Sequence, residues 1–171
     1  GDHFFGIINI QNIDVAGTTV WSQDISPVDQ ISGIFAQRVE AILSPDPHDA
    51  ANLLPHIVLG APTVTQFTGS DGTIFDTTGI LSGNEIFAIF RDIGGLVFQH
   101  NGTMLDDATR ATDGSLWLTA GYGPGVDGVY GTADDPAYTY SHVSIGLPLE
   151  NFTGETWAQL DVIQNNTSYL F

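Results

Sequence analysis

The chain has 171 residues, 42% of them hydrophobic and 11% aromatic, which is enough for one folded domain with a substantial core, expected over residues 1–171. Twenty acidic residues face three basic ones, which argues against a nucleic-acid partner because phosphates are bound mainly by Lys and Arg. No apolar run reaches the roughly 18 residues of a spanning helix, so membrane insertion is not expected. The lack of cysteine excludes disulfides, thiolate catalysis and Cys-based zinc sites.

The acidity of the chain reflects missing cations rather than a crowded surface. Charged residues make up only 13% of the chain, and the only basic residues are Arg38, Arg91 and Arg110. Most of the aspartates stand beside Gly, Pro, Thr or Ser, where the Asp side chain stabilises turns by bonding the local backbone. This lysine-free, cysteine-free composition resembles that of bacterial or archaeal secreted and surface proteins. An extracellular or cell-surface location is therefore expected.

The N-terminal third of the chain predicts one strand region and one helix. Apolar residues alternate over residues 4–15, with a shift of period at Asn12 that indicates a bulge, and residues 18–21 continue or pair with this strand. An amphipathic helix is predicted over about 27–43. Pro27 suits its first turn, and the apolar residues that recur at helical spacing are Ile31, Ile34, Phe35, Val39, Ile42 and Leu43.

The remainder of the chain has the patterns of β-strands separated by turn residues. The predicted strands cover residues 57–59, 63–67, 85–90, 96–99, 115–119, 138–145 and 157–163. Such a set of short strands with a single helix is typical of a mainly β fold. The sequence therefore predicts an antiparallel β-sandwich or a barrel-like domain, with the helix packed against one side.

Residues 125–136 form the most distinctive loop. Over 126–136 the sequence resembles short Asp-Gly…Gly-Thr-Ala-Asp-Asp elements of large secreted bacterial surface proteins, in which calcium-stabilised loops are common. The EF-hand spacing is absent, yet carboxylates in a Gly-rich loop are ligands that Ca²⁺ accepts. Ca²⁺ is therefore the predicted cofactor. Its best candidate ligands are Asp127, Asp134 and Asp135, with Asp106, Asp107 and Asp113 as further candidates. The alternative is a hairpin with solvated carboxylates.

Catalytic motifs are absent from the sequence. It contains no nucleophile elbow, phosphate-binding loop or dinucleotide fingerprint, so no catalytic or cofactor-binding residue is predicted. The five histidines share no short metal-ligand spacing, although His100 and His142 could meet in space. An enzyme is therefore not expected. A secreted hydrolase with two converging carboxylates remains as an alternative.

Two further groups of residues suggest contact with glycans. Four asparagines stand in Asn-X-Ser/Thr acceptor sequences for N-glycosylation: Asn101, Asn151, Asn165 and Asn166. An aromatic platform for sugar stacking could be formed by Trp117, Tyr138 and Tyr140, whereas aromatic residues on strands more often belong to a core.

Three classes of function follow from these features. The first is an extracellular structural or assembly module, such as a subunit of a surface filament or layer or an adhesin domain, stabilised by calcium. Its partners are further copies of itself or other surface proteins, joined by strand addition through residues 4–15. The second class is a carbohydrate-binding module with glycan partners. The third is the secreted hydrolase.

Overall fold

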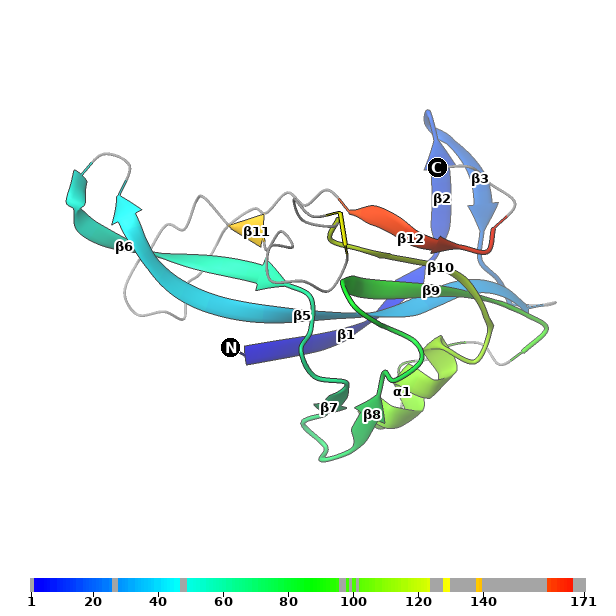
Figure 1. The fold of residues 1–171 in the computed structure, drawn as a ribbon. Coiled ribbons are helices and arrows are strands. Elements are labelled where there is room, and N and C mark those ends of the chain that lie inside the picture. The colour runs from blue at the N-terminus through cyan, green and yellow to red at the C-terminus, as the bar shows by residue number, and fades with distance from the viewer. Residues whose placement is uncertain are drawn as a thin grey trace.

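The computed structural model describes residues 2–25, 28–46, 49–95, 98, 100, 102–123, 128–129, 138–139 and 160–167. These residues form twelve β-strands and one α-helix, α1 (Met104–Ala111), as Figure 1 shows. The strands are β1 (Asp2–Ile10), β2 (Asn12–Val15), β3 (Thr18–Ser22), β4 (Asp24–Ile25), β5 (Val28–Asp46), β6 (Asp49–Gly60), β7 (Gln66–Thr68), β8 (Ile74–Asp76), β9 (Glu85–Ile93), β10 (Ser115–Gly121), β11 (Tyr138–Thr139) and β12 (Asp161–Asn165). The expected mainly β class with one helix is confirmed.

Eight of the strands form one antiparallel sheet around β5. The order is β11-β6-β5-β9-β10-β12, and β1 and β4 also pair with β5. Residues 29–35 of β5 pair with β9, while residues 31–39 pair with β1 on the opposite edge. The second half of β5 continues as a long hairpin with β6. In the described residues this sheet is open and does not close into a barrel. Of the two predicted architectures, the sandwich-like one is therefore the one that remains.

The helix expected over residues 27–43 is wrong, because residues 28–46 form the strand β5. Gln30, Ile31 and Ser32 are each no more than 1% exposed. Since consecutive residues of a strand point to opposite faces, both faces of β5 are covered here. A strand covered on both faces loses the alternation of apolar and polar residues that identifies half-buried strands. Its apolar residues then recur at a spacing that also fits a helix.

The helix of the structure is α1, at residues 104–111. It begins with a capping box, in which Thr103 Oγ1 accepts a hydrogen bond from the backbone N–H of Asp106 at 3.1 Å and the Asp106 carboxylate accepts one from the Thr103 N–H. Asp71 Oδ2 accepts the N–H of Met104 at 2.7 Å. Asp106, which the sequence offered as a further candidate calcium ligand, therefore has a role in helix capping.

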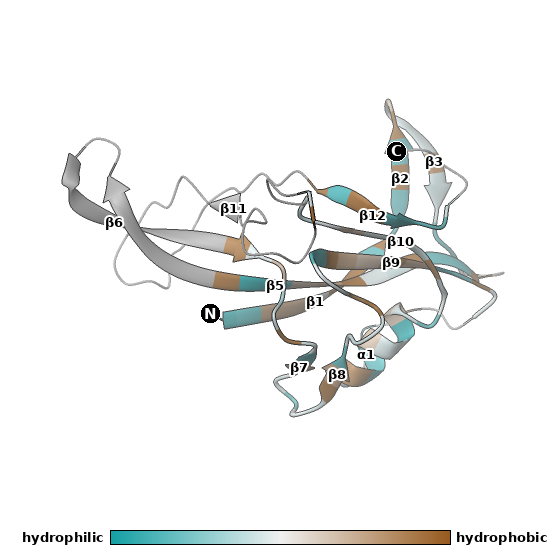
Figure 2. Cartoon of the chain, viewed as in Figure 1, coloured by the Kyte–Doolittle hydropathy of each residue, from teal (hydrophilic) through white to brown (hydrophobic). Residues whose placement is uncertain are grey.

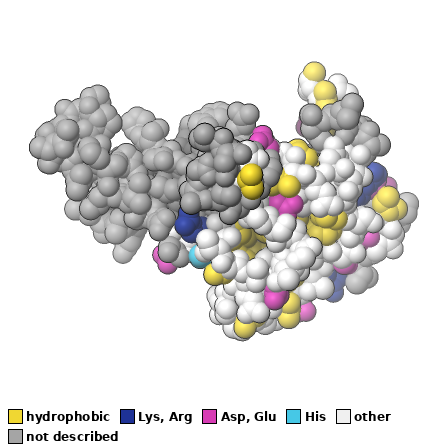
Figure 3. Space-filling view, viewed as in Figure 1, with side chains coloured by type: hydrophobic (Ala, Val, Ile, Leu, Met, Phe, Trp, Pro, Cys, Tyr) yellow, Lys and Arg dark blue, Asp and Glu magenta, His cyan; other side chains and the backbone are white. Residues whose placement is uncertain are grey.

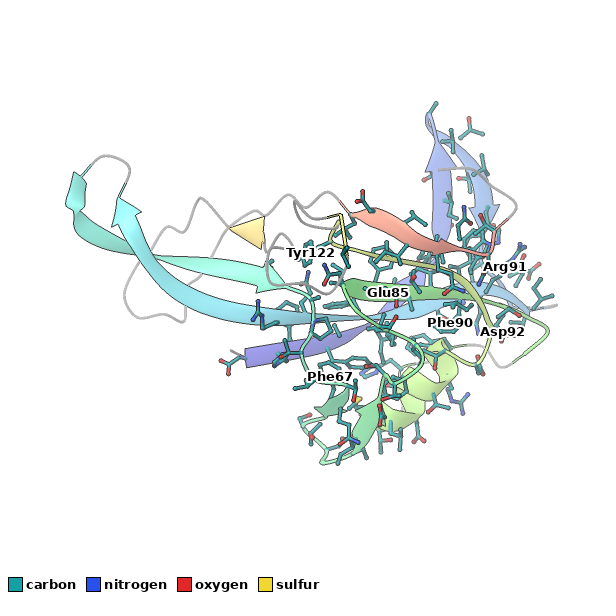
Figure 4. All side chains as sticks on the ribbon, viewed as in Figure 1. Phe67, Glu85, Phe90, Arg91, Asp92 and Tyr122 are labelled. Carbon is teal, nitrogen blue, oxygen red and sulfur yellow. The ribbon has the colours of Figure 1, made fainter. Side chains whose placement is uncertain are left out.

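The main core lies between one face of the sheet and a layer made by β7, β8 and α1. Its members are Ile34, Ala36, Phe67, Phe75, Leu81, Ala88, Phe90 and Ala108. Figure 4 shows Phe90 on the sheet and Phe67 in the covering layer. Phe5 of β1 joins this core by stacking on Phe67, with ring centroids 5.2 Å apart. The core thus fixes β1 and β9 on either side of β5.

A buried carboxylate joins β9 to β10. Glu85 is 5% exposed, and its Oε2 accepts hydrogen bonds from the Ser82 N–H at 2.7 Å and the Ser82 hydroxyl at 3.1 Å. Its Oε1 accepts a hydrogen bond from the fully buried Thr119 hydroxyl. Because both oxygens have partners, the burial of this polar group is compensated.

Candidate functional site

The three best candidate calcium ligands are outside the described part of the chain. Asp127, Asp134 and Asp135 all lie there. Asp113 lies in the loop between α1 and β10 and is exposed. Among the described residues, no group of three or more His, Asp or Glu side chains could hold a metal ion. On the face shown in Figure 3, the acidic side chains are scattered rather than gathered in one patch.

Asp107 forms a pair with His100 beside an open cavity. The Asp107 side chain is 3% exposed and its Oδ2 lies 2.5 Å from Nδ1 of His100, whose side chain is 85% exposed. The other carboxylate oxygen of Asp107 has no hydrogen-bond partner among the described residues. The cavity of about 540 Å³ is also lined by Ser70, Asp71 and Phe98. His142, the suggested partner of His100, lies outside the described residues.

Two of the four glycosylation acceptors can be located. Asn101 and Asn151 lie outside the described residues. Asn165 is exposed at the end of β12, and its side-chain oxygen accepts hydrogen bonds from the N–H of Thr167 at 2.9 Å and its hydroxyl at 2.6 Å. The amide nitrogen of Asn166 instead donates to the backbone oxygen of Leu116 at 3.1 Å. Asn166 therefore helps to hold the chain after β12 against β10.

The predicted aromatic platform is not brought together by the fold. Tyr138 lies on β11, and the pairing of β11 with β6 and of β6 with β5 places it level with Val39 of β5. Trp117 lies on β10, and the pairing of β10 with β9 and of β9 with β5 places it level with Ser32 of β5. The two are four strands apart, about 19 Å across the sheet at roughly 4.8 Å per strand, and about 20 Å apart along it. Tyr140 lies outside the described residues.

Trp117 lines an open cavity of about 590 Å³ at the β12 side of the sheet. Leu116 and Leu118 pair with the consecutive residues Phe90 and Ile89 of β9, so Trp117 is the extra residue of a β-bulge. Bulges re-aim side chains and occur frequently beside binding sites. The cavity is also lined by Arg91, Asp92, Ile93, Asp113 and Asn166. These neighbours come from three separate segments. From the sequence, Trp117 was predicted as part of an aromatic platform and Asp113 and Asn166 only for other roles, whereas the Arg91–Ile93 segment was not predicted as part of a site.

An ion pair holds one wall of this cavity in place. Arg91 of β9 donates two hydrogen bonds to Asp29 of β5, from Nε to Oδ1 at 2.9 Å and from Nη2 to Oδ2 at 2.7 Å. Trp21 of the β2–β3 hairpin also donates to Asp29, at 3.3 Å. The hydrogen bond from Arg91 lowers the pKa of Asp29, burial opposes this, and the Trp21 bond lowers it further. The pair thus ties the hairpin to two central strands.

Replacing Arg91 with glutamine is expected to lower the free energy of unfolding by about 1 kcal/mol at pH 7, since the pair is one-third exposed. A carboxyl with a lowered pKa stabilises the fold above its ordinary value of 3.8, and this contribution is lost as the pH falls through its folded pKa. Urea unfolding should therefore show a smaller difference between wild type and R91Q at pH 2.5 than at pH 7. An undiminished difference at pH 2.5 would contradict the assigned role of Asp29.

The outer edge of β1 is a second candidate site. Over Asp2–Ile10 the strand pairs with β5, and it pairs with no other described strand. Residues 4–10 include no charged residue and no proline, and Figure 2 shows that β1 changes from hydrophilic to apolar along its length. Natural edge strands are commonly protected by lysine, proline or a bulge. Residues 4–10 contain neither lysine nor proline, so this part of the edge lacks those two forms of protection.

Two open cavities flank β1. One, of about 590 Å³, is lined by His3, Phe4 and Phe5, and the other, of about 540 Å³, by Phe5, Gly6 and Ile7. Residues of the 64–71 segment and Met104 line the opposite walls. When an edge strand receives another strand, alternate side chains of the added strand need such pockets. The edge of β1 therefore offers both backbone groups and side-chain space.

No helix in the described part of the chain has both the length and the apolar character that crossing a bilayer requires. No model of a known protein family, no curated protein and no solved structure is significantly similar to this chain.

Proposed function

We propose that this chain is an extracellular structural module that assembles with further copies of itself by strand addition at the outer edge of β1. The observation that carries the proposal is the outer edge of the nine-residue strand β1, which has no strand partner among the described residues and no charge over residues 4–10. An unprotected edge of this length is a template for pairing with a second chain. The occupant is another copy because the same edge is present on every copy.

The net charge of −17 sets the conditions for this assembly. Copies with the same strong charge repel one another, and salt or divalent cations weaken this repulsion. In the proposed module, calcium held by the loop with Asp127, Asp134 and Asp135 contributes to stability and assembly. The edge strand adds a single acidic residue, Asp2 at its end, and residues 4–10 add no charge. Association is therefore favoured at physiological or higher salt and in the presence of Ca²⁺.

Hydrogen exchange measured over a range of protein concentrations tests the edge directly. In an antiparallel pair, alternate backbone N–H groups of β1 bond to β5 and the others point outward. Strand addition should slow exchange of the outward-pointing set at high concentration and leave it fast at low concentration. The exposed strand β3 serves as an internal reference whose exchange should not depend on concentration.

An isosteric substitution provides a second test. Asn9 is exposed on β1, and N9D adds a negative charge to the edge without changing the shape of the side chain. Like charges on paired strands repel, so N9D should weaken association severalfold in sedimentation at 150 mM salt. The matched control is N12D, which makes the same change at an exposed position on β2. Deleting the N-terminus is a poorer test, because β1 is also the partner of β5.

Sedimentation separates the forms of assembly. A dimer indicates pairing of β1 with β1, whereas larger species indicate pairing of β1 with a different edge. An 18.2 kDa monomer at all concentrations, both with calcium and with chelator, would refute the proposal. Equal weakening by N9D and N12D would place the contact away from β1.

A further inference from the structure

The cavity beside Trp117 combines aromatic, apolar and carboxylate groups on the side of the sheet away from β1. Trp117 is half-buried in its β-bulge, and Ile93 beside it is 70% exposed, the largest exposed fraction among the large apolar residues described. Asp92 and Asp113 supply two carboxylates, and Asn166 supplies an amide. Figure 4 shows Arg91 and Asp92 together near the end of β9, at some distance from Glu85.

The two carboxylates of this cavity lie in different surroundings. Asp92 is 9% exposed, and one of its oxygens accepts a hydrogen bond from Gln30 at 3.3 Å. Desolvation raises the pKa of Asp113, and the negative charge of Asp92 raises it further. Both acids line the same cavity. The guanidinium of Arg91, which also lines it, is bonded to Asp29, and the positive charge of Arg110 partly opposes the rise in the pKa of Asp113.

We propose that this cavity binds a neutral saccharide. A sugar ring has an apolar face of C–H groups that stacks on indole, and Trp117 and Ile93 provide the surface for it. Its hydroxyl groups donate hydrogen bonds, and the carboxylates of Asp92 and Asp113 accept them strongly. With the side-chain amide of Asn166, the rim of the cavity can both donate and accept hydrogen bonds.

Electrostatics selects among the saccharides. Acidic sugars would bring a negative charge next to two carboxylates on a chain of net charge −17, and like charges in such a volume repel. Neutral sugars avoid this cost and use the carboxylates as acceptors. The cavity involves β9, β10 and β12 rather than β1, so this site is independent of the proposed assembly edge.

Saturation-transfer NMR with the full chain tests the site. The probes are neutral hexasaccharides of glucose, xylose and mannose at about 1 mM, in the range of weak glycan affinities, with a hexamer of galacturonic acid as the anionic probe. At least one neutral probe should receive saturation, and the anionic probe should not. Because the readout is on the ligand, the three tryptophans of the chain do not complicate it.

Variants locate the binding. W117A should abolish the transfer, while I74A, at an exposed apolar position of β8 outside the cavity, should retain it. D113N keeps the shape of an exposed side chain and loses the charge, so it should weaken binding about tenfold, as charge-assisted hydrogen bonds are replaced by neutral ones. The matched control D14N, at an exposed position on β2, should bind like wild type. D113N also keeps the test decisive if W117A does not fold.

Three results would overturn the proposal. They are the absence of saturation transfer to every neutral probe, binding that is unchanged in both W117A and D113N, and binding of the acidic hexamer alone. The assembly proposal survives each of them, because sedimentation and hydrogen exchange at β1 report on a different edge of the sheet.

Discussion

Replacing Ile34 with alanine is expected to lower the free energy of unfolding by about 2–5 kcal/mol. Ile34 is fully buried on β5, in the cluster that joins the sheet to β7, β8 and α1. Removing its outer carbons leaves a cavity among strands that are fixed on both sides by hydrogen bonds, so the site cannot collapse to fill it. Urea unfolding followed by tryptophan fluorescence measures the loss.

I74A is the matched control for this prediction. Ile74 stands on β8 in the covering layer and is 52% exposed, so the same truncation should cost no more than about 1 kcal/mol. Similar losses for I34A and I74A would mean that the layer of β7, β8 and α1 does not pack on the sheet as described.

Gly33→Ala is expected to destabilise the chain by about 1–3 kcal/mol through overpacking. Gly33 faces Ile89 in the pairing of β5 with β9, and a Cβ atom at this position would lie 2.1 Å from the backbone oxygen of Ala88. A backbone oxygen within a strand pair cannot move aside without separating the strands. Thermal unfolding should show the change as a lower Tm, at about 2–4 °C per kcal/mol for a chain of this size.

G6A distinguishes a backbone clash from a side-chain clash. A Cβ atom on Gly6 of β1 would lie 2.3 Å from the ring of Phe35, and that ring can rotate away. The effect of G6A should therefore be smaller than that of G33A. If G6A proves the more damaging, the register of β1 on β5 differs from the one described.

The strands were largely predictable because their patterns are local. The expected strands over residues 4–15, 57–59, 85–90 and 115–119 overlap β1 and β2, β6, β9 and β10. The expected strand over 138–145 is described only at residues 138–139. The central strand β5 was missed because cover on both of its faces depends on segments distant in the chain. A local pattern does not contain that information.

The helix α1 shows a signal that could have been used. Thr103 and Asp106 have the spacing of a capping box, followed by helix-compatible residues, yet the segment has only eight residues and few large apolar ones. From the sequence alone, Asp106 is also a candidate calcium ligand. An aspartate three residues after a threonine is as compatible with capping as with metal binding, and only the backbone conformation distinguishes them.

Of the residues that line the cavity beside Trp117, only Trp117 itself was predictable from the sequence as a ligand-contacting residue. Trp117 stands out because it is one of three tryptophans. Its neighbours Asp92, Asp113 and Asn166 come from different segments, and their meeting depends on the register of β10 between β9 and β12. The pairing of β10 with β9 includes two register shifts and its pairing with β12 a third, and alternation in the sequence does not reveal them.

The many partners of β5 have a consequence for how the chain acquires its structure. This strand pairs with β1, which precedes it, and with β9, which follows it, and its ion pair joins residues 62 positions apart. Closing such loops costs entropy before any contact is gained, so folding dominated by these pairings is slow, on the order of milliseconds to seconds. During synthesis, β5 and its apolar residues remain without their central partner until β9 has emerged. The period before that pairing is when the chain is most exposed to misassembly.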